Sequence, residues 1–136
     1  MKLITAILAM SLQSGPPAPV DNQYEGRAPI VGLEGPSSDA CPGIGRISGF
    51  EARKGDFIRV RIDADEYAPT KDKIDLSTLV WLCEADKDWQ GIVYPIGENQ
   101  DLGDCRVSSA LPVAEPYDGP CQFGWVPAKY IDLVAG

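Results

Sequence analysis

Residues Gly124 to Leu133 read GWVPAKYIDL, and this stretch decides the fold. Its Pro-Ala-Lys-Tyr segment, Pro127 to Tyr130, predicts one turn of 3₁₀ helix. The residues after that turn predict a last short strand, which ends near Val134. The end of the chain is therefore expected to be a tight turn followed by a strand.

Short strands with turn signals between them precede this ending. They are predicted at Arg46–Phe50, Phe57–Asp63, Leu79–Cys83 and Trp89–Tyr94. In the second of them Ile58, Val60 and Ile62 fall on one face, and this period of two marks a strand buried on one side. Ala64 to Lys73 is predicted as a charged connection, and Glu84 to Asp88 as a turn. No segment keeps the 3.6-residue period of a helix, so the sequence predicts an all-β barrel or sandwich.

The segment from Ser14 to Pro42 differs in composition from the rest of the chain. It is rich in Gly, Pro, Ser and Asp and includes Gly15-Pro16-Pro17-Ala18-Pro19. Such a composition predicts an extended linker, partly in the polyproline II conformation. Within it, the run Ala28 to Leu33 can add an edge strand. We therefore predict a signal peptide at 1–14, a linker at 15–40 and a folded domain at 41–136.

The first residues predict export. Lys2 precedes an apolar run, Leu3 to Met10. The run is too short to span a bilayer, which needs about 20 residues, but it suits a secretory signal peptide. Small residues for cleavage lie at Ala9, Ser11 and Ser14. The alternative is a short apolar strand or helix at the N-terminus. Export would make the protein periplasmic or secreted.

Four cysteines, Cys41, Cys83, Cys105 and Cys121, support export. An even number of widely spaced cysteines in a small chain is typical of disulfides in an oxidising compartment. Three pairings are possible, and we favour Cys41–Cys83 with Cys105–Cys121. Closing a loop of about 15 residues stabilises a fold by about 3 kcal/mol in the chain-entropy description. The alternative is four buried free thiols in a cytosolic protein.

Composition argues against several functional classes. The net charge is −8 and histidine is absent. An acidic chain without a basic run does not suit nucleic acid or anionic lipid. Without histidine, neither Ser-His-Asp catalysis nor a Cys/His zinc site is possible, and the cysteines lack the paired CxxC spacing of zinc and redox sites. The acidic stretches 63–66 and 98–104 lack EF-hand spacing. We expect no enzyme activity, no cofactor and no metal.

Several motifs resemble SH3 domains. The ending Gly124 to Leu133 resembles their Gly-aromatic-Val/Phe-Pro segment, which enters a 3₁₀ turn carrying a Tyr. Phe57 to Arg61 resembles the Leu-x-Val-Arg strand of bacterial SH3 (SH3b-like) domains, and Val80 to Tyr94 resembles their central hairpin. The chain is most similar to small exported four-cysteine SH3-domain proteins of proteobacteria, some labelled integron-associated. The motifs of that group are found here at Cys41, Gly45-Arg46, Val80–Cys83, Asp104–Ser109 and Tyr117–Cys121.

The resemblance implies a fold and a binding surface. The fold is an SH3-like small barrel of about five to seven strands, with a long disulfide-pinned insertion (96–123) before the last strands and one 3₁₀ turn. The surface lies beside the loop within 63–73 and consists of Trp89, Tyr94, Trp125, Pro127 and Tyr130. Aromatic side chains with a polar tip suit peptides or sugars. They also suit a barrel interior: both interpretations stay open for Trp89, Pro127 and Tyr130, whereas for Trp125 and Trp81 we favour the interior.

Two functions fit these observations. The first is an exported, non-catalytic binding module that recognises a cell-wall (peptidoglycan) peptide or an envelope protein partner through the aromatic surface. The alternative is an inhibitor or immunity-type protein that blocks a secreted enzyme through the insertion at 96–123.

Overall fold

The computed structural model describes residues 26–49, 56–95 and 102–136, and this part of the chain is all-β. Seven strands form one antiparallel sheet in the order β4-β3-β8-β6-β5-β2-β9. Their bounds are β2 Gly43–Ile47, β3 Phe57–Arg61, β4 Thr70–Asp75, β5 Leu79–Asp86, β6 Trp89–Tyr94, β8 Gln122–Pro127 and β9 Ile131–Ala135. A 3₁₀ turn, η1 (Ala128–Tyr130), joins β8 to β9, as predicted from the ending. A second sheet pairs β1 (Ile30–Val31) with β7 (Glu115–Pro116).

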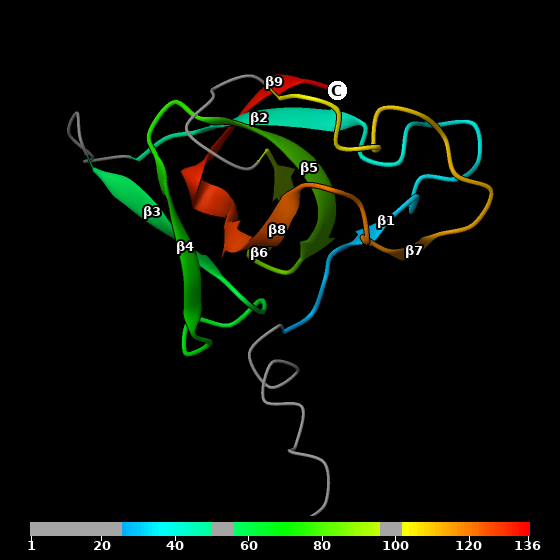
Figure 1. The fold of residues 1–136 in the computed structure, drawn as a ribbon. Helices are drawn as coiled ribbons and strands as arrows, with labels where there is room; N and C mark the ends of the chain where they lie inside the picture. Colours follow the sequence, from blue (N-terminus) through cyan, green and yellow to red (C-terminus); the bar gives the residue numbers. More distant parts are fainter. Residues whose placement is uncertain (1–25, 50–55, 96–101) are drawn as a thin grey trace, which may run out of the picture.

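The large sheet curves around one apolar core. Figure 1 shows its strands wrapped about a common centre, with β8 and η1 in the middle. Side chains from six of the strands fill that centre: Ile47, Val60, Ile74, Val80, Ile92, Tyr94 and Val126. Among the described residues no ladder joins the edge strands β4 and β9, so the sheet is not a closed barrel.

The alternating patterns in the sequence locate most of the strands. Trp89–Tyr94 is β6 at both ends, and the runs at Phe57 and Leu79 begin β3 and β5. The structure adds β4 inside the predicted charged connection. Its sequence, Thr-Lys-Asp-Lys-Ile-Asp, buries only Ile74. A charged strand at the edge of a sheet gives almost no hydrophobic pattern to detect.

Two segments distant in sequence form a side lobe, which we define as residues 27–41 and 102–121. The lobe lies at the right of Figure 1, around β1 and β7. The amides of Ala40 and Cys41 donate to the carbonyls of Ser109 and Val107, at 2.9 and 3.0 Å, and that of Tyr117 donates to the Pro29 carbonyl at 2.9 Å. A separate apolar cluster holds the lobe to the sheet: Val31, Ala40, Cys41, Val93, Cys105, Val107 and Tyr117.

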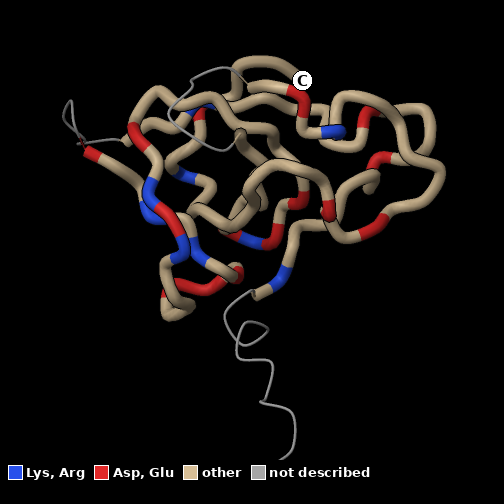
Figure 2. Tube along the Cα trace, viewed as in Figure 1, with Lys and Arg blue, Asp and Glu red and all other residues tan. Residues whose placement is uncertain are grey.

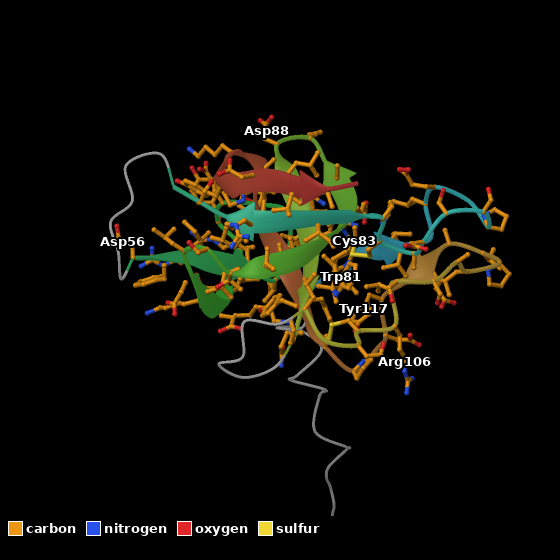
Figure 3. All side chains as sticks on the ribbon, turned by 90° about the horizontal axis from the view of Figure 1, so that it is seen from above. Asp56, Trp81, Cys83, Asp88, Arg106 and Tyr117 are labelled. Carbon is orange, nitrogen blue, oxygen red and sulfur yellow. A yellow bond between two sulfur atoms is a disulfide. The ribbon has the colours of Figure 1, made fainter. Side chains whose placement is uncertain are left out.

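Both predicted disulfides are present. Cys41–Cys83 ties the lobe to β5, and Cys105–Cys121 closes the insertion. Figure 3 shows Cys83 close to Trp81, on the side of the molecule that carries Tyr117 and Arg106. Disulfides of this kind form and persist in oxidising compartments.

The predicted linker is corrected over its second half. Residues 26–40 pack against the insertion and the sheet, and the suggested edge strand within 28–33 is β1. Gly- and Pro-rich composition suggested an extended linker, but this segment is ordered by partners distant in sequence, from Ile62, 35 residues after Arg27, to Trp125, 98 residues after it. The signal peptide (1–14), the first part of the linker (15–25) and the first part of the insertion (96–101) lie outside the described residues.

Candidate functional site

A groove of about 970 Å³ runs across one end of the sheet, between two walls. One, the loop wall, is formed by β3 and the loop after it. The other, the turn wall, is formed by the β5–β6 turn and η1. The lining residues are Phe57, Ile58, Arg59, Arg61, Ala64, Asp65, Glu66, Lys87, Asp88, Trp89, Pro127, Ala128, Lys129 and Tyr130.

The turn wall is fixed by backbone contacts. Trp89 is the cross-strand partner of both Asp86 and Pro127, so its ring stands beside the start of η1. The amide of Ala128 donates to the carbonyl of Asp88 at 2.8 Å. Lys87 adopts a left-handed φ of 54° in the turn, a conformation uncommon for a residue with a side chain. These contacts join the turn and η1 into a single edge of the groove.

The loop wall is held by side chains that satisfy its backbone. The Arg61 guanidinium donates to the Ala68 carbonyl at 3.2 Å and to Thr70 Oγ1 at 3.0 Å. The carboxylate of Asp65 accepts from the amide of Tyr67 at 2.9 Å. These bonds keep the loop folded back over β3, with Ala64 and Glu66 facing the groove.

The charge of the groove differs from that of the whole chain. Four cations line it (Arg59, Arg61, Lys87 and Lys129) against three carboxylates (Asp65, Glu66 and Asp88), whereas the chain has a net charge of −8. Within the described residues none of these seven groups forms an ion pair. Figure 2 shows blue segments on β3 and β4, with others elsewhere along the chain. The groove therefore carries a slight excess of positive charge on an acidic protein.

Two of the groove cations lie over aromatic rings. Arg59 lies 5.6 Å from the ring centre of Phe57, and Lys129 lies 5.2 Å from that of Tyr130. Each wall thus combines an apolar surface with a cation. Such a surface suits a ligand that has both apolar groups and carboxylates.

Three of the five sequence-predicted binding residues line this groove: Trp89, Pro127 and Tyr130. All three are half-buried, so part of each side chain faces the groove. The sequence did not single out Phe57 and Lys129. Phe57 is an exposed aromatic residue at the first position of β3. The alternating pattern places Ile58 and Val60 on the core face, so Phe57 falls on the opposite, outer face. A large aromatic residue on the outer face of a strand is the sequence feature that could have indicated a binding role.

The prediction that Tyr94 and Trp125 belong to the same surface is wrong. Tyr94 is 3% exposed and lies in the sheet core, and its hydroxyl donates to Asp72 Oδ2 at 2.9 Å. Burial, reinforced by the hydrogen bond to Asp72 and its negative charge, raises the pKa of this phenol. Trp125 has no exposed surface at all.

Trp125 is covered by the start of the described chain, which we call the strap (residues 27–29). Its indole Nε1 donates to the Arg27 carbonyl at 2.7 Å, and the Arg27 guanidinium lies 4.3 Å from its ring centre. Pro29 packs on Gly91, where a Cβ would lie 2.7 Å from that of Pro29. Glycine at 91 therefore makes room for the strap.

Arg27 also connects three carboxylates. Its guanidinium lies 2.8 Å from Glu84, 2.9 Å from Asp86 and 3.6 Å from Asp63. Asp63 immediately precedes the loop wall, and Asp86 immediately precedes the turn wall. The strap consequently sits between the two walls, at one end of the groove.

The described part of the chain contains no group of three Cys, Asp or Glu side chains placed to hold a metal ion. Among the same residues no helix has the length and apolar character needed to cross a membrane. Compared with protein-family models, curated proteins and solved structures, the chain shows no match to any of them.

Proposed function

We propose that this protein is a non-catalytic binding module whose ligand is an extended peptide held in the groove. The observation that supports this most directly is an apolar floor, formed by Trp89, Pro127 and Tyr130, beside cations that form no ion pair within the described residues. Apolar grooves with a few well-placed polar groups are the usual form of a ligand site.

We also propose an SH3-like fold. The strand order supports it, because the central hairpin β5–β6 continues into β8, and η1 then leads to β9, which returns to pair with β2. The groove lies between the long loop after β3 and the β5–β6 turn. In this proposal β3 and β4 are the two arms of that loop.

The ligand we propose is a cell-wall peptide or a peptide segment of an envelope protein, bound outside the cytoplasm in the periplasm or after secretion. Two disulfides support an oxidising location. Peptides of the bacterial wall carry free carboxylates, which Arg59 and Lys129 are placed to receive. An extended peptide also suits a groove that is lined from two opposite walls.

Retention on purified peptidoglycan sacculi tests this proposal. We expect the chain to co-sediment with sacculi and the Trp89→Ala variant to lose at least tenfold in retention. Tyr67→Ala is the matched control, since Tyr67 is an 86% exposed aromatic residue outside the groove lining. Equal retention of both variants and the parent would refute a role for the groove, and no retention at all would refute the wall ligand.

A second candidate function is inhibition of a secreted enzyme by the side lobe. The lobe exposes Leu33 (55%) and Val113 (70%), while residues 32–40 and 109–116 contain three carboxylates and no Lys or Arg. A rigid acidic surface with apolar groups suits a basic partner. Tight binding to one secreted enzyme that weakens with salt and with Val113→Asp, but not with Trp89→Ala, would favour this function over the first.

A further inference from the structure

Two cations stand directly opposite each other on the outer face of the hairpin that β3 and β4 form. Arg59 is the cross-strand partner of Lys73, and both residues are exposed. Arg59 also lines the groove. Like charges at directly opposite positions repel each other and destabilise a strand pair. The hairpin therefore carries a pair of residues that its own stability does not favour.

The two cationic groups share one aromatic ring, that of Phe57. The Arg59 guanidinium lies 5.6 Å from the ring centre, and the Lys73 ammonium lies 4.7 Å from it. The face of a ring attracts a cation, but it leaves most N–H donors of a guanidinium or an ammonium available for other partners. Phe57 is 40% exposed at the first position of β3, so it gathers both cations at that end of the groove.

Neither cation has an anionic partner within the described part of the chain. The ion pairs found there all belong to Arg27. Asp75, the cross-strand partner of Phe57, is the next residue of β4 on this face, and it forms no ion pair with Arg59 or Lys73 among the described residues. The pair can therefore receive an anion from outside.

The other end of the loop wall carries the opposite charge. Asp65 and Glu66 line the groove in the loop that follows β3, beyond Arg61. Strand β3 extends about 13 Å from Phe57 to Arg61. An anionic group in the groove is consequently attracted to the Phe57 end and repelled from the loop end. This polarity gives an extended ligand a preferred direction.

We infer that Arg59 and Lys73 form a site for the terminal carboxylate of an extended peptide, whose last side chain packs against Phe57. The inference rests on the proposed function, since it specifies which end of the ligand the groove receives. A carboxylate offers two oxygens to the guanidinium fork of Arg59, and Lys73 adds a second positive charge. From this end the peptide runs along β3 toward Asp65 and Glu66, which suit a basic side chain nearer its amino terminus.

A set of synthetic peptides tests this assignment. The first has the sequence Ala-Glu-Lys-Ala-Ala with a free terminal carboxylate, and the second is the same peptide with a terminal amide. We expect the parent protein to bind the free acid about tenfold more tightly than the amide in isothermal titration calorimetry, because the amide loses the charge-assisted hydrogen bonds. The third has glutamine in place of glutamate and a free carboxylate, and it should bind like the first.

Substitutions at the pair should remove this discrimination. Arg59→Gln and Lys73→Gln are each expected to bind the free acid about fivefold more weakly, and the double variant should bind acid and amide equally. Lys71→Gln is the matched control. It removes the same charge from the same strand, but Lys71 stands in the bulge between Thr70 and Asp72 and lies 4.1 Å from the centre of another ring, that of Phe123. This control should discriminate as the parent does.

Thermal unfolding separates a binding role from a structural one. Arg59→Gln and Lys73→Gln should unfold at the temperature of the parent or above it, because each removes the repulsion between like charges. A lower unfolding temperature in both variants, with the affinity for the free acid unchanged, would assign the pair to stability and overturn the inference.

The peptide titrations can overturn it in four other ways. These are no binding of any peptide to the parent, equal binding of acid and amide, weaker binding of the glutamine peptide than of the amide, and discrimination that persists in the double variant. Retention on sacculi distinguishes the two proposals. Trp89-dependent retention that Arg59→Gln and Lys73→Gln leave unchanged would remove this inference and leave the proposed function standing. Acid-specific peptide binding without retention would keep the carboxylate site and refute the wall ligand.

Discussion

The seven-stranded sheet and the side lobe are stabilised in opposite ways. The sheet surrounds an apolar core with strands of five to eight residues and contains no disulfide between its own strands. The lobe has two strands of two residues each, and its cluster includes three small or sulfur-containing residues, Ala40, Cys41 and Cys105. Both disulfides involve the lobe: Cys105–Cys121 lies within it, and Cys41–Cys83 joins it to β5.

The contrast shows what cross-links replace in a small domain. A region with few ladder bonds and little apolar volume cannot offset the entropy of ordering its backbone. Covalent links reduce that cost by restricting the unfolded chain. The lobe is therefore expected to depend on its disulfides and on a few hydrogen bonds, and the sheet on burial.

The largest effect is expected from removing the Cys41–Cys83 bridge. Its ends are 42 residues apart, so the double variant Cys41→Ala/Cys83→Ala should lose about 4 kcal/mol of unfolding free energy in chemical denaturation. In hydrogen exchange the Ala40 amide, which bonds into the lobe, should lose more protection than amides of β6. Equal loss of protection in both regions would contradict the contrast between them.

A second effect is expected where the two regions touch. Gly91→Ala places a Cβ 2.7 Å from that of Pro29 and 3.0 Å from the Glu84 carbonyl oxygen. Overpacking of this kind costs about 2 kcal/mol, and displacement of the strap should shift Trp125 emission to longer wavelength. Combining it with Pro29→Gly should recover part of the loss. A Gly91→Ala chain as stable as the parent would show that the strap does not pack as described.

Within the lobe, Tyr117→Phe should have a smaller effect. The Tyr117 hydroxyl donates to the Cys105 carbonyl and accepts from the Cys121 amide, both at 2.9 Å, and thus spans the second disulfide. Loss of both bonds should cost about 1 to 2 kcal/mol in thermal or chemical unfolding. A neutral substitution would mean that the disulfide alone orders this loop.

The smallest effect is a pH dependence that originates in the sheet. The pKa of Tyr94 is raised above its ordinary value of 10.0, chiefly by burial. The neutral phenol is therefore favoured in the folded state, while the unfolded chain loses this proton near pH 10. Stability should fall as the pH rises above 10, and Tyr94→Phe should make that fall shallower. An unchanged slope in denaturation curves recorded at pH 9 and pH 11 would rule out this contribution.

The fold was largely predictable because its strands alternate. Strand β6 and the η1 turn follow from local patterns at Trp89–Tyr94 and Pro127–Tyr130. The number and spacing of the cysteines predicted disulfides but left three pairings possible, and the structure has the favoured one. The lobe was not predictable, since its order comes from contacts between residues 27–41 and 102–121. The local composition there resembles that of an unstructured linker. The segment is ordered only by its contacts with residues far away in sequence.

The groove was predictable only in part. An aromatic residue has the same sequence signature in a core and in a binding surface, and burial alone separates Trp89 from Trp125. Trp125 is covered by Arg27, which lies 98 residues away in sequence. No local sequence pattern predicts a contact over such a separation. Arg59 and Lys129 likewise read as ordinary surface charges until the two walls are placed opposite each other.

The arrangement of the two disulfides affects what happens when a protease cuts the chain. The bridges close two separate loops, 41–83 and 105–121, which do not overlap. A single cut at the exposed bend near Val113 falls inside the second loop, so both products stay covalently joined. Such a nicked molecule would migrate as one species until it is reduced. Cleavage at this exposed bend therefore does not release a fragment.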